Sequence, residues 1–359
     1  MKKLVYGAAA LTLAGTAFAS DTDWSAFNQD VAYNQDVQSL ATSLAAEKEG
    51  PSIGGFLQTL YSLDSDNDIS SFSILRARIE VTGGREGYAY KVGYETSTNQ
   101  LLDAYFVIPV SSISAKFGRF RPAVVRGGLV SNSQRFFIDR SALGAAFEGR
   151  QDGIQLSGDF DQLSWWASIT NGQDDFAAAA NNGGDTDDYL FAVRVALDLV
   201  GGGINDGVEG AYGGPDEIGA QVAVSFYDDG VFDDGDGFVV EGHVVSSVYS
   251  FGFEFADLSD QGASASTATT AGPSTSLPLG NDTTPFTLYG TYMLTPDQWE
   301  VGVRFQDTDD AFDSTSVDIG VVNYLDGHNL KWGFGFRTTD SDAEVLDTEI
   351  FQFQLSMRF

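Results

Sequence analysis

The sequence predicts an all-β protein: a sixteen-stranded antiparallel transmembrane β-barrel that follows a short N-terminal periplasmic segment. Short segments of alternating apolar and polar residues recur from residue 54 to the end of the chain. The chain ends on such a segment, with the aromatic residue Phe359 in last place. No segment after the N-terminal region approaches the ~20 consecutive apolar residues of a membrane-spanning helix, whereas barrel strands keep their mean hydropathy low by alternating.

Residues 1–19 have the pattern of a secretory signal peptide. Lys2 and Lys3 precede an apolar run, and Ala17-Phe18-Ala19 matches a small-residue cleavage site. We therefore expect export by a cleaved signal peptide to the outer membrane of a Gram-negative bacterium, with a short N-terminal membrane anchor as the alternative. The chain contains no cysteine, which excludes disulfides and thiolate metal sites.

Residues 20–50 differ in composition from the rest of the chain. Their apolar residues fall near helical spacing, and Gly50-Pro51 would end a helix. The segment is predicted to be periplasmic and either helical or disordered. The barrel is expected to occupy residues 51–359.

The last strand shows the alternation most clearly. Its odd positions, from Phe351 to Phe359, are apolar, and its even positions are polar. Successive side chains of a strand point to opposite faces, so one face is apolar and the other polar. In a soluble β-sandwich the apolar face would be buried, whereas in a membrane barrel it contacts lipid. The aromatic C-terminal residue favours the barrel, and Phe359 is predicted to be an assembly signal.

Sixteen segments share this pattern. They are 54–63, 71–82, 87–96, 101–109, 112–120, 150–159, 162–171, 188–200, 216–227, 237–245, 248–258, 284–294, 298–307, 315–324, 329–338 and 347–358. The connections between them alternate between short and long, as expected for short periplasmic turns and longer external loops. Two connections do not fit: 201–215 is long for a periplasmic turn, and 97–100 is short for an external loop.

The chain is strongly acidic, with a formal net charge of −32. This balance argues against binding to nucleic acid, which needs a basic surface. The acids cluster in predicted connections, where solvated loops are favoured over calcium sites. The two histidines, His243 and His328, have no nucleophile or metal ligands nearby in the sequence. We therefore expect no enzyme activity, cofactor or metal.

The scarce basic residues gather in one stretch, Lys116 to Arg150, which contains only two acids. Most of it falls on the predicted third external loop, about 121–149. A loop that folds into a barrel narrows the pore, and charges at the narrowest point select ions. The arginine fork suits oxyanions. The residues predicted to form an anion-binding constriction are Arg119, Arg121, Arg126, Arg135 and Arg140.

Further basic residues occupy strand positions expected to line the lumen. They are Arg76, Arg78, Lys91, Arg194, Arg304, Lys331 and Arg337. Acidic residues such as Glu80, Glu95, Glu241 and Asp318 share the same faces. Two interpretations stay open: these cations extend a positive surface, or they pair with the acids across the lumen, with Arg78 near Glu80 or Lys91 near Glu95.

A run of about 30 residues resembles the signature of the phosphate-selective porin O and P family. Ala115 to Pro122 resembles a strand with G-x-F-x-P, and Ser131 to Ser141 resembles a loop with S-S-x-x-x-x-F-x-x-R-S, with Asn132 in place of the second serine. The resemblance implies a trimer of barrels, each with the third loop folded inside and an arginine-lined path for anions. Lys116 is the only lysine of the region, whereas phosphate-specific members carry several, so phosphate specificity does not follow.

The expected function is passive diffusion of small hydrophilic solutes, with a preference for anions that could include phosphate-like oxyanions. The alternatives are a general or cation-preferring porin dominated by its acidic loops, and a structural envelope barrel. The expected partners are two further copies of the chain in a homotrimer, outer-membrane lipid and lipopolysaccharide, and small ions.

Overall fold

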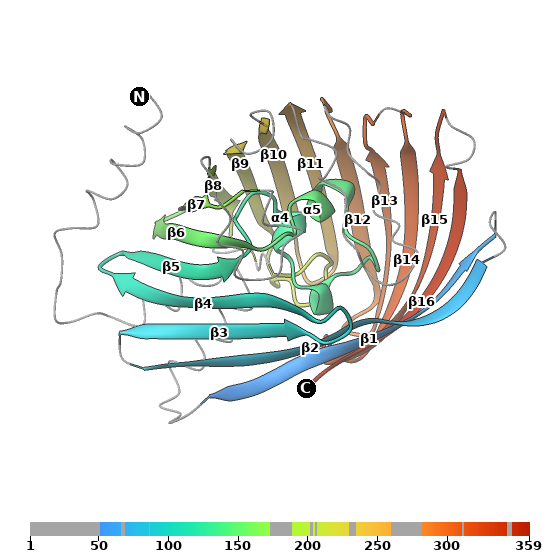
Figure 1. Cartoon of the computed structure of the whole chain (residues 1–359). Coiled ribbons are helices and arrows are strands. Elements are labelled where there is room, and N and C mark those ends of the chain that lie inside the picture. The colour runs from blue at the N-terminus through green and yellow to red at the C-terminus, as the bar shows by residue number, and fades with distance from the viewer. Residues whose placement is uncertain are drawn as a thin grey trace.

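A computed structural model shows a closed barrel of sixteen antiparallel strands, each paired with its sequence neighbours (Figure 1). It describes residues 51–65, 69–85, 87–172, 189–201, 204, 207–229, 235–259, 282–310, 312–342 and 347–359. The predicted signal peptide and the predicted segment 20–50 lie outside these residues. No helix among the described residues is long and apolar enough to cross a bilayer.

All sixteen predicted strands form, and every predicted boundary lies within three residues of the observed one. The strands are β1 (Ser52–Asp64), β2 (Ile69–Arg85), β3 (Tyr88–Glu95), β4 (Gln100–Val110), β5 (Ile113–Phe120), β6 (Gln151–Phe160), β7 (Leu163–Thr170), β8 (Leu190–Val200), β9 (Gly219–Asp229), β10 (Gly235–Val245), β11 (Tyr249–Ser259), β12 (Phe286–Thr295), β13 (Trp299–Asp307), β14 (Thr315–Asp326), β15 (Leu330–Asp340) and β16 (Thr348–Arg358). The predicted fold class is confirmed.

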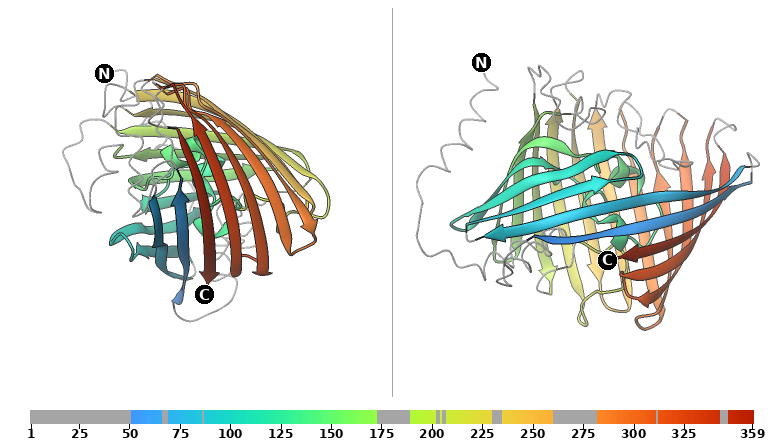
Figure 2. Two further views of the ribbon diagram at one scale, coloured as in Figure 1. Left: turned by 90° about the vertical axis from the view of Figure 1, so that its right-hand side faces the viewer. Right: turned by 60° about the horizontal axis from the view of Figure 1, so that its bottom comes forward.

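The barrel closes where the first strand meets the last, seen in Figure 2 as a blue strand beside a dark red one. The pairing runs from Phe56 opposite Arg358 to Asp64 opposite Ile350. Phe359 extends it, because its N–H and C=O each bond to the backbone of Gly55 at 3.0 Å. A closed ladder leaves no sheet edge, which is the condition for strands to cross hydrocarbon.

The two faces of the barrel follow the predicted alternation. On β16, Phe351 and Leu355 are exposed on the outside, and Gln352 and Ser356 are buried on the inside. The other strands repeat this arrangement, so large apolar side chains cover the outer surface and polar ones line the lumen. This is the reverse of a water-soluble protein and matches a barrel surrounded by lipid.

One strand departs from the predicted alternation. Strict alternation along the predicted strand 71–82 would place Leu75 on the outer face with Ile79, but Leu75 is buried inside against Leu60 and Ile138. A β-bulge is the cause, because Ile74 pairs with Thr59 and Arg76 with Gln58, which leaves Leu75 without a direct partner. The extra residue shifts the face of everything before it on the strand.

The connections confirm the alternation of short and long. At one end of the barrel, here called the turn end, several strand pairs are joined by two or three residues. These turns contain residues with positive φ, such as Ser111, Asp161 and Asp297, which suit hairpins of this length. The other end, the loop end, carries most of the longer connections. The exception at the turn end is the long connection between β8 and β9, residues 201–218, of which Val208, Glu209 and Ala211 are buried inside the barrel.

Candidate functional site in the lumen

The stretch 121–149, here called the constriction loop, lies inside the barrel and not over its mouth (Figure 1). It holds three short helices: α4 (Arg126–Leu129), the 3-10 helix η2 (Asn132–Gln134) and α5 (Ala142–Ala146). Val124, Val125 and Leu143 pack against apolar residues of β8 to β11. Phe136 and Phe137 pack against Tyr289, Val322 and Tyr324 on β12 and β14. The loop therefore crosses the lumen and carries its own apolar contacts with the wall.

A row of glycines on the wall makes room for the middle of this loop. Gly302, Gly320 and Gly335 lie side by side on β13, β14 and β15. A Cβ atom on Gly302 or Gly320 would lie 2.6 Å or 2.8 Å from the Phe136 ring, and one on Gly335 would lie 3.1 Å from Ile138. Here glycine supplies space for a close approach and not backbone freedom, since none of the three has a positive φ.

Polar side chains of the wall bond to the backbone of the constriction loop. The Glu241 carboxylate on β10 accepts from the N–H of Arg126 at 2.7 Å. Glu254 on β11 accepts from the N–H of Gly127 at 3.1 Å and from the Ser141 hydroxyl at 2.6 Å. Gln306 on β13 accepts from the N–H of Ala142 at 2.7 Å. These buried acceptors satisfy loop N–H groups that would otherwise be unpaired and costly.

Three of the five predicted constriction arginines are used to hold the loop in shape. Arg121 donates to the carbonyls of Gly128 and Glu148, the latter at 3.0 Å. Arg126 donates to the Tyr289 hydroxyl at 3.0 Å and to the carbonyl of Val208.

Arg140 is the most heavily bonded of the three. It pairs with the Glu148 carboxylate at 2.7 Å and also reaches the carbonyl of Val130 at 2.7 Å and the Asn132 side chain at 2.9 Å. Its side chain thus joins three separate parts of the constriction loop.

The other two predicted constriction arginines differ from these. Arg119 lies on β5, beside the loop, and pairs with Asp152 at 3.3 Å. Arg135 lies in the loop, is only 4% exposed and donates from Nη2 to the carbonyl of Ile138 at 2.7 Å. Its Nε and Nη1 atoms are buried without a hydrogen-bond partner among the described residues. Two nitrogen donors of Arg135 are therefore not used in hydrogen bonds to the described residues.

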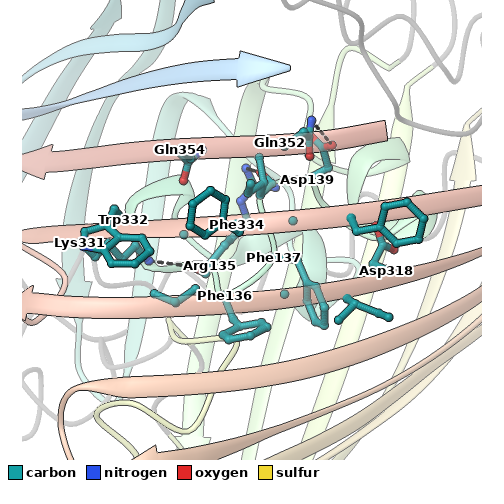
Figure 3. Close-up of a pocket in the computed structure, with 17 residues that line it drawn as sticks. Arg135, Phe136, Phe137, Asp139, Asp318, Lys331, Trp332, Phe334, Gln352 and Gln354 are labelled. Carbon is teal, nitrogen blue, oxygen red and sulfur yellow. Dashed lines mark hydrogen bonds between the residues drawn. The ribbon is translucent and has the colours of Figure 1, made fainter. Parts of the chain in front are cut away.

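Two lumen-facing cations accompany Arg135. Lys331 on β15 donates from Nζ to the backbone carbonyl of Arg135 at 2.6 Å, and Arg76 on β2 donates to the Gln58 side chain at 3.2 Å. In the part of the chain that the structure describes, none of the three forms an ion pair with a carboxylate. Arg135 and Lys331 line a cavity of about 20 Å³ between the loop and β14 to β16, together with Asp139, Asp318 and Gln354 (Figure 3).

The remaining predicted lumen cations pair with acids. Arg78 lies 3.8 Å from Glu80 and 3.6 Å from Glu95, and Lys91 lies 3.1 Å from Glu80 and 3.7 Å from Asp103. The expected Arg78–Glu80 contact is present, whereas Lys91 pairs with Glu80 and Asp103 and not with Glu95.

The cations of β8, β13 and β15 also pair with acids. Arg194 pairs with Glu241, and Arg304 and Arg337 share Asp318 at 3.0 Å and 2.6 Å. Each of these strand cations thus has an acidic partner, as the second of the two interpretations supposed, but these pairs join the same strand or nearby strands of the wall and do not cross the lumen.

Burial and nearby charges act differently on the pKa values of Glu148 and Arg135 in the loop. Burial alone would raise the pKa of the Glu148 carboxyl, but Arg140, Arg76 and Arg121 around it hold that pKa well below its usual range. Burial lowers the pKa of Arg135, and the positive charges of Arg76 and Arg140 lower it further. Glu148 is therefore fully ionised at neutral pH, and Arg135 lies among other cations whose effect on its pKa Glu209 and Glu148 offset in part.

The sequence did not point to several residues that shape this site. Glu209, on the connection between β8 and β9, accepts from two N–H groups of the loop, and Gly302 and Gly320 receive Phe136. The one available signal for Glu209 was the unusual length of its connection. In the sequence, Gly302 and Gly320 were recognisable only as residues of the lumen-facing, polar side of their strands.

Comparison with known proteins agrees with this architecture. No protein family and no curated protein matches the sequence. A mutant porin of Rhodopseudomonas blastica superposes with a TM-score of 0.53 over 86% of this chain and 100% of its own, at 14% identity. OmpT, an outer membrane protein of Vibrio cholerae, superposes with a TM-score of 0.56 over 87% and 99%, at 12% identity. This chain has the fold of bacterial outer-membrane porins. The likeness extends to the fold alone.

Proposed function

We propose that this protein is an outer-membrane diffusion channel for small hydrophilic solutes, with a preference for anions. The observation that carries the preference is Arg135: a buried guanidinium on the loop inside the barrel, with two unused donor atoms and with Arg76 and Lys331 nearby. Positive charge at the narrowest part of a pore lowers the barrier for anions. The closed barrel, its apolar exterior and its polar lumen support the channel itself.

The setting in the cell is part of the same proposal. The chain is exported by its N-terminal signal peptide, spans the outer membrane among lipid and lipopolysaccharide, and assembles as a homotrimer. A trimer form is known for the structurally similar OmpT of Vibrio cholerae, at a TM-score of 0.56 and 13% identity. The resemblance to the phosphate-selective porin O and P family stays a hypothesis that the motif around Arg119 to Ser141 supports. No step of catalysis, cofactor or metal enters this function.

The test is the reversal potential of the purified protein in a planar bilayer under a potassium chloride gradient. We expect the sign of an anion-preferring channel, and chloride, phosphate and sulfate should be compared in one preparation. A cation-preferring sign would overturn the preference and leave a channel. No measurable conductance would overturn the channel as well and favour a structural envelope barrel.

A variant links the preference to one residue. A charge acts on an ion ~4 Å away with about 1 kcal/mol in a water-filled pore, which corresponds to about fivefold in permeability. Arg135→Gln is expected to lower the chloride-to-potassium permeability ratio by up to that factor. Arg85→Gln, which removes the same charge from an exposed site at the turn end, is the matched control and should leave the ratio unchanged. Equal effects of the two variants would argue against a selective role for Arg135.

The rival channel is a general or cation-preferring porin. The observation in its favour is the group of buried acids on β10, β11 and β13, Glu241, Glu254 and Glu300, in a chain of net charge −32. Two of these acids already accept hydrogen bonds from loop N–H groups, and Glu241 also pairs with Arg194. Their charge is thus partly used by the protein, which is why we favour the anion preference.

A further inference from the structure

The connection between β8 and β9 enters the lumen from the turn end. Val208, Glu209 and Ala211 are buried, although a connection of this kind normally lies outside a barrel. The wall holds it in place: Ser250 donates to the Glu209 carbonyl at 3.0 Å, and the N–H of Ala211 donates to the Glu300 carboxylate at 2.6 Å. Near its outer part, the Tyr212 ring stacks on Tyr324 with centroids 4.1 Å apart.

The inward connection meets the constriction loop through one side chain. Oε2 of Glu209 accepts from the N–H of Phe136 at 2.9 Å and from that of Phe137 at 3.0 Å. Its other oxygen lies 3.7 Å from the Arg304 guanidinium. A second hydrogen bond between the two segments runs from Arg126 of the loop to the Val208 carbonyl. A buried carboxylate that accepts two N–H groups fixes both peptide planes, because charge-assisted hydrogen bonds are the strong ones.

We infer that the constriction is built from two segments, the loop from one end and this connection from the other, and that Glu209 is the positioning residue that joins them. The inference rests on the proposed function for its effect on ions. Phe136 and Phe137 follow Arg135 directly, so the carboxylate that holds their N–H groups also holds the backbone from which the Arg135 side chain extends. Glu209 acts on solutes through Arg135 and does not need to touch them.

Hydrogen exchange on the full-length protein in detergent tests this coupling without any need for conductance. Peptides that contain Phe136 and Phe137 are expected to exchange about tenfold faster in Glu209→Asp, since the shorter side chain keeps the charge but does not reach both N–H groups. Glu209→Gln keeps the shape and one carbonyl acceptor, and is expected to show an intermediate increase. Glu217→Ala, at an exposed acid of the same connection, is the control and should exchange like the wild type.

Single-channel recordings separate positioning from charge. Glu209→Asp is expected to increase the open-channel current noise and to keep the wild-type permeability ratio, because the carboxylate remains. Glu209→Ala is expected to increase the noise and also to shift the ratio toward anions, because a negative charge leaves the lumen. If Glu209 only stabilised the barrel, Glu209→Asp would not increase the noise while leaving the permeability ratio unchanged.

The outcomes are distinguishable from those of the proposed function. If wild-type protein does not conduct but Glu209→Asp exchanges faster at Phe136 and Phe137, the channel proposal fails and the coupling stands. If exchange and noise in Glu209→Asp both equal those of wild type in a folded barrel, the coupling is wrong. Glu209→Gln decides the case if the other variants fail to fold, because unchanged exchange in that variant would also overturn the inference.

Discussion

Arg135 and Arg140 show how residues of one type, five positions apart, take different parts in the same loop. Arg140 joins Glu148, Val130 and Asn132, so its charge and its donors serve the loop. Arg135 keeps two donor atoms free of protein partners among the described residues. Sequence alone gives both the same charge, and only the folded path of the loop shows which carbonyls each one meets. We therefore propose the selective role for Arg135, whereas the side chain of Arg140 holds parts of the loop together.

The ion pair of Arg140 with Glu148 leads to a prediction about pH. Because the folded pKa of Glu148 lies below its usual range, the pair stabilises the fold fully above the ordinary value of about 4.3 and is lost only as the pH falls through the lower, folded pKa. Glu148→Gln is expected to lower the free energy of unfolding at pH 7 by about 1–3 kcal/mol. Unfolding in detergent, measured for both proteins from pH 7 to strongly acidic pH, should show this difference shrink with acidity.

The same experiment contains the result that would contradict it. A difference between wild type and Glu148→Gln that stays constant down to the lowest pH would mean that ionisation of this carboxyl does not matter to the loop.

At the scale of elements, the lumen wall is shaped to fit the loop. The glycines of β13 and β14 leave space that the Phe136 ring fills. Gly320→Ala is expected to destabilise the protein by about 1–3 kcal/mol, because its Cβ would lie 2.8 Å from that ring and packed cores resist added volume. Gly290→Ala on the neighbouring β12 is the matched control, since its Cβ would find only ordinary contacts, at 3.6 Å or more.

Unfolding midpoints in detergent measure the two glycine variants. We expect loss of stability in Gly320→Ala only. If Gly290→Ala is destabilised to the same degree, then lost strand geometry, and not a crowded Phe136, explains the effect.

The strands could be predicted from sequence because alternation is a local property that each strand repeats. Leu75 shows the limit, since an apolar side chain fits either face and the bulge beside it leaves no mark in the sequence. The connection of Glu209 shows another limit. Its length was visible, but its path depends on partners such as Glu300 and Ser250, which lie 40 or more positions away in sequence.

At the scale of the whole molecule, closure depends on the last residue through its backbone. Both hydrogen bonds of Phe359 to Gly55 use main-chain atoms, and the exposed ring lies outside that pairing. Phe359→Ala should therefore keep the stability of the folded barrel in detergent within about 1 kcal/mol, the value of one net hydrogen bond. If the ring is an assembly signal, the same variant lowers the amount of barrel found in the outer membrane.

Heat-dependent migration on gels measures folded barrel in membranes, and denaturant unfolding measures stability. Phe351→Ala, which removes another exposed aromatic ring from β16, is the control. A drop in membrane yield that is equal for the two variants would assign the effect to lost apolar surface and not to the end of the chain.

Segments from both ends of the barrel narrow the lumen, so neither the constriction loop nor the β8–β9 connection alone sets its width. Trimming the chain between Asn132 and Arg140 would remove Arg135 and its neighbours, yet Glu209 and Ala211 would stay buried inside the barrel, held by Ser250 and Glu300. Shortening one of the two segments should thus widen the pore by less than the number of removed residues suggests. A wide bore would require remodelling both inserts together.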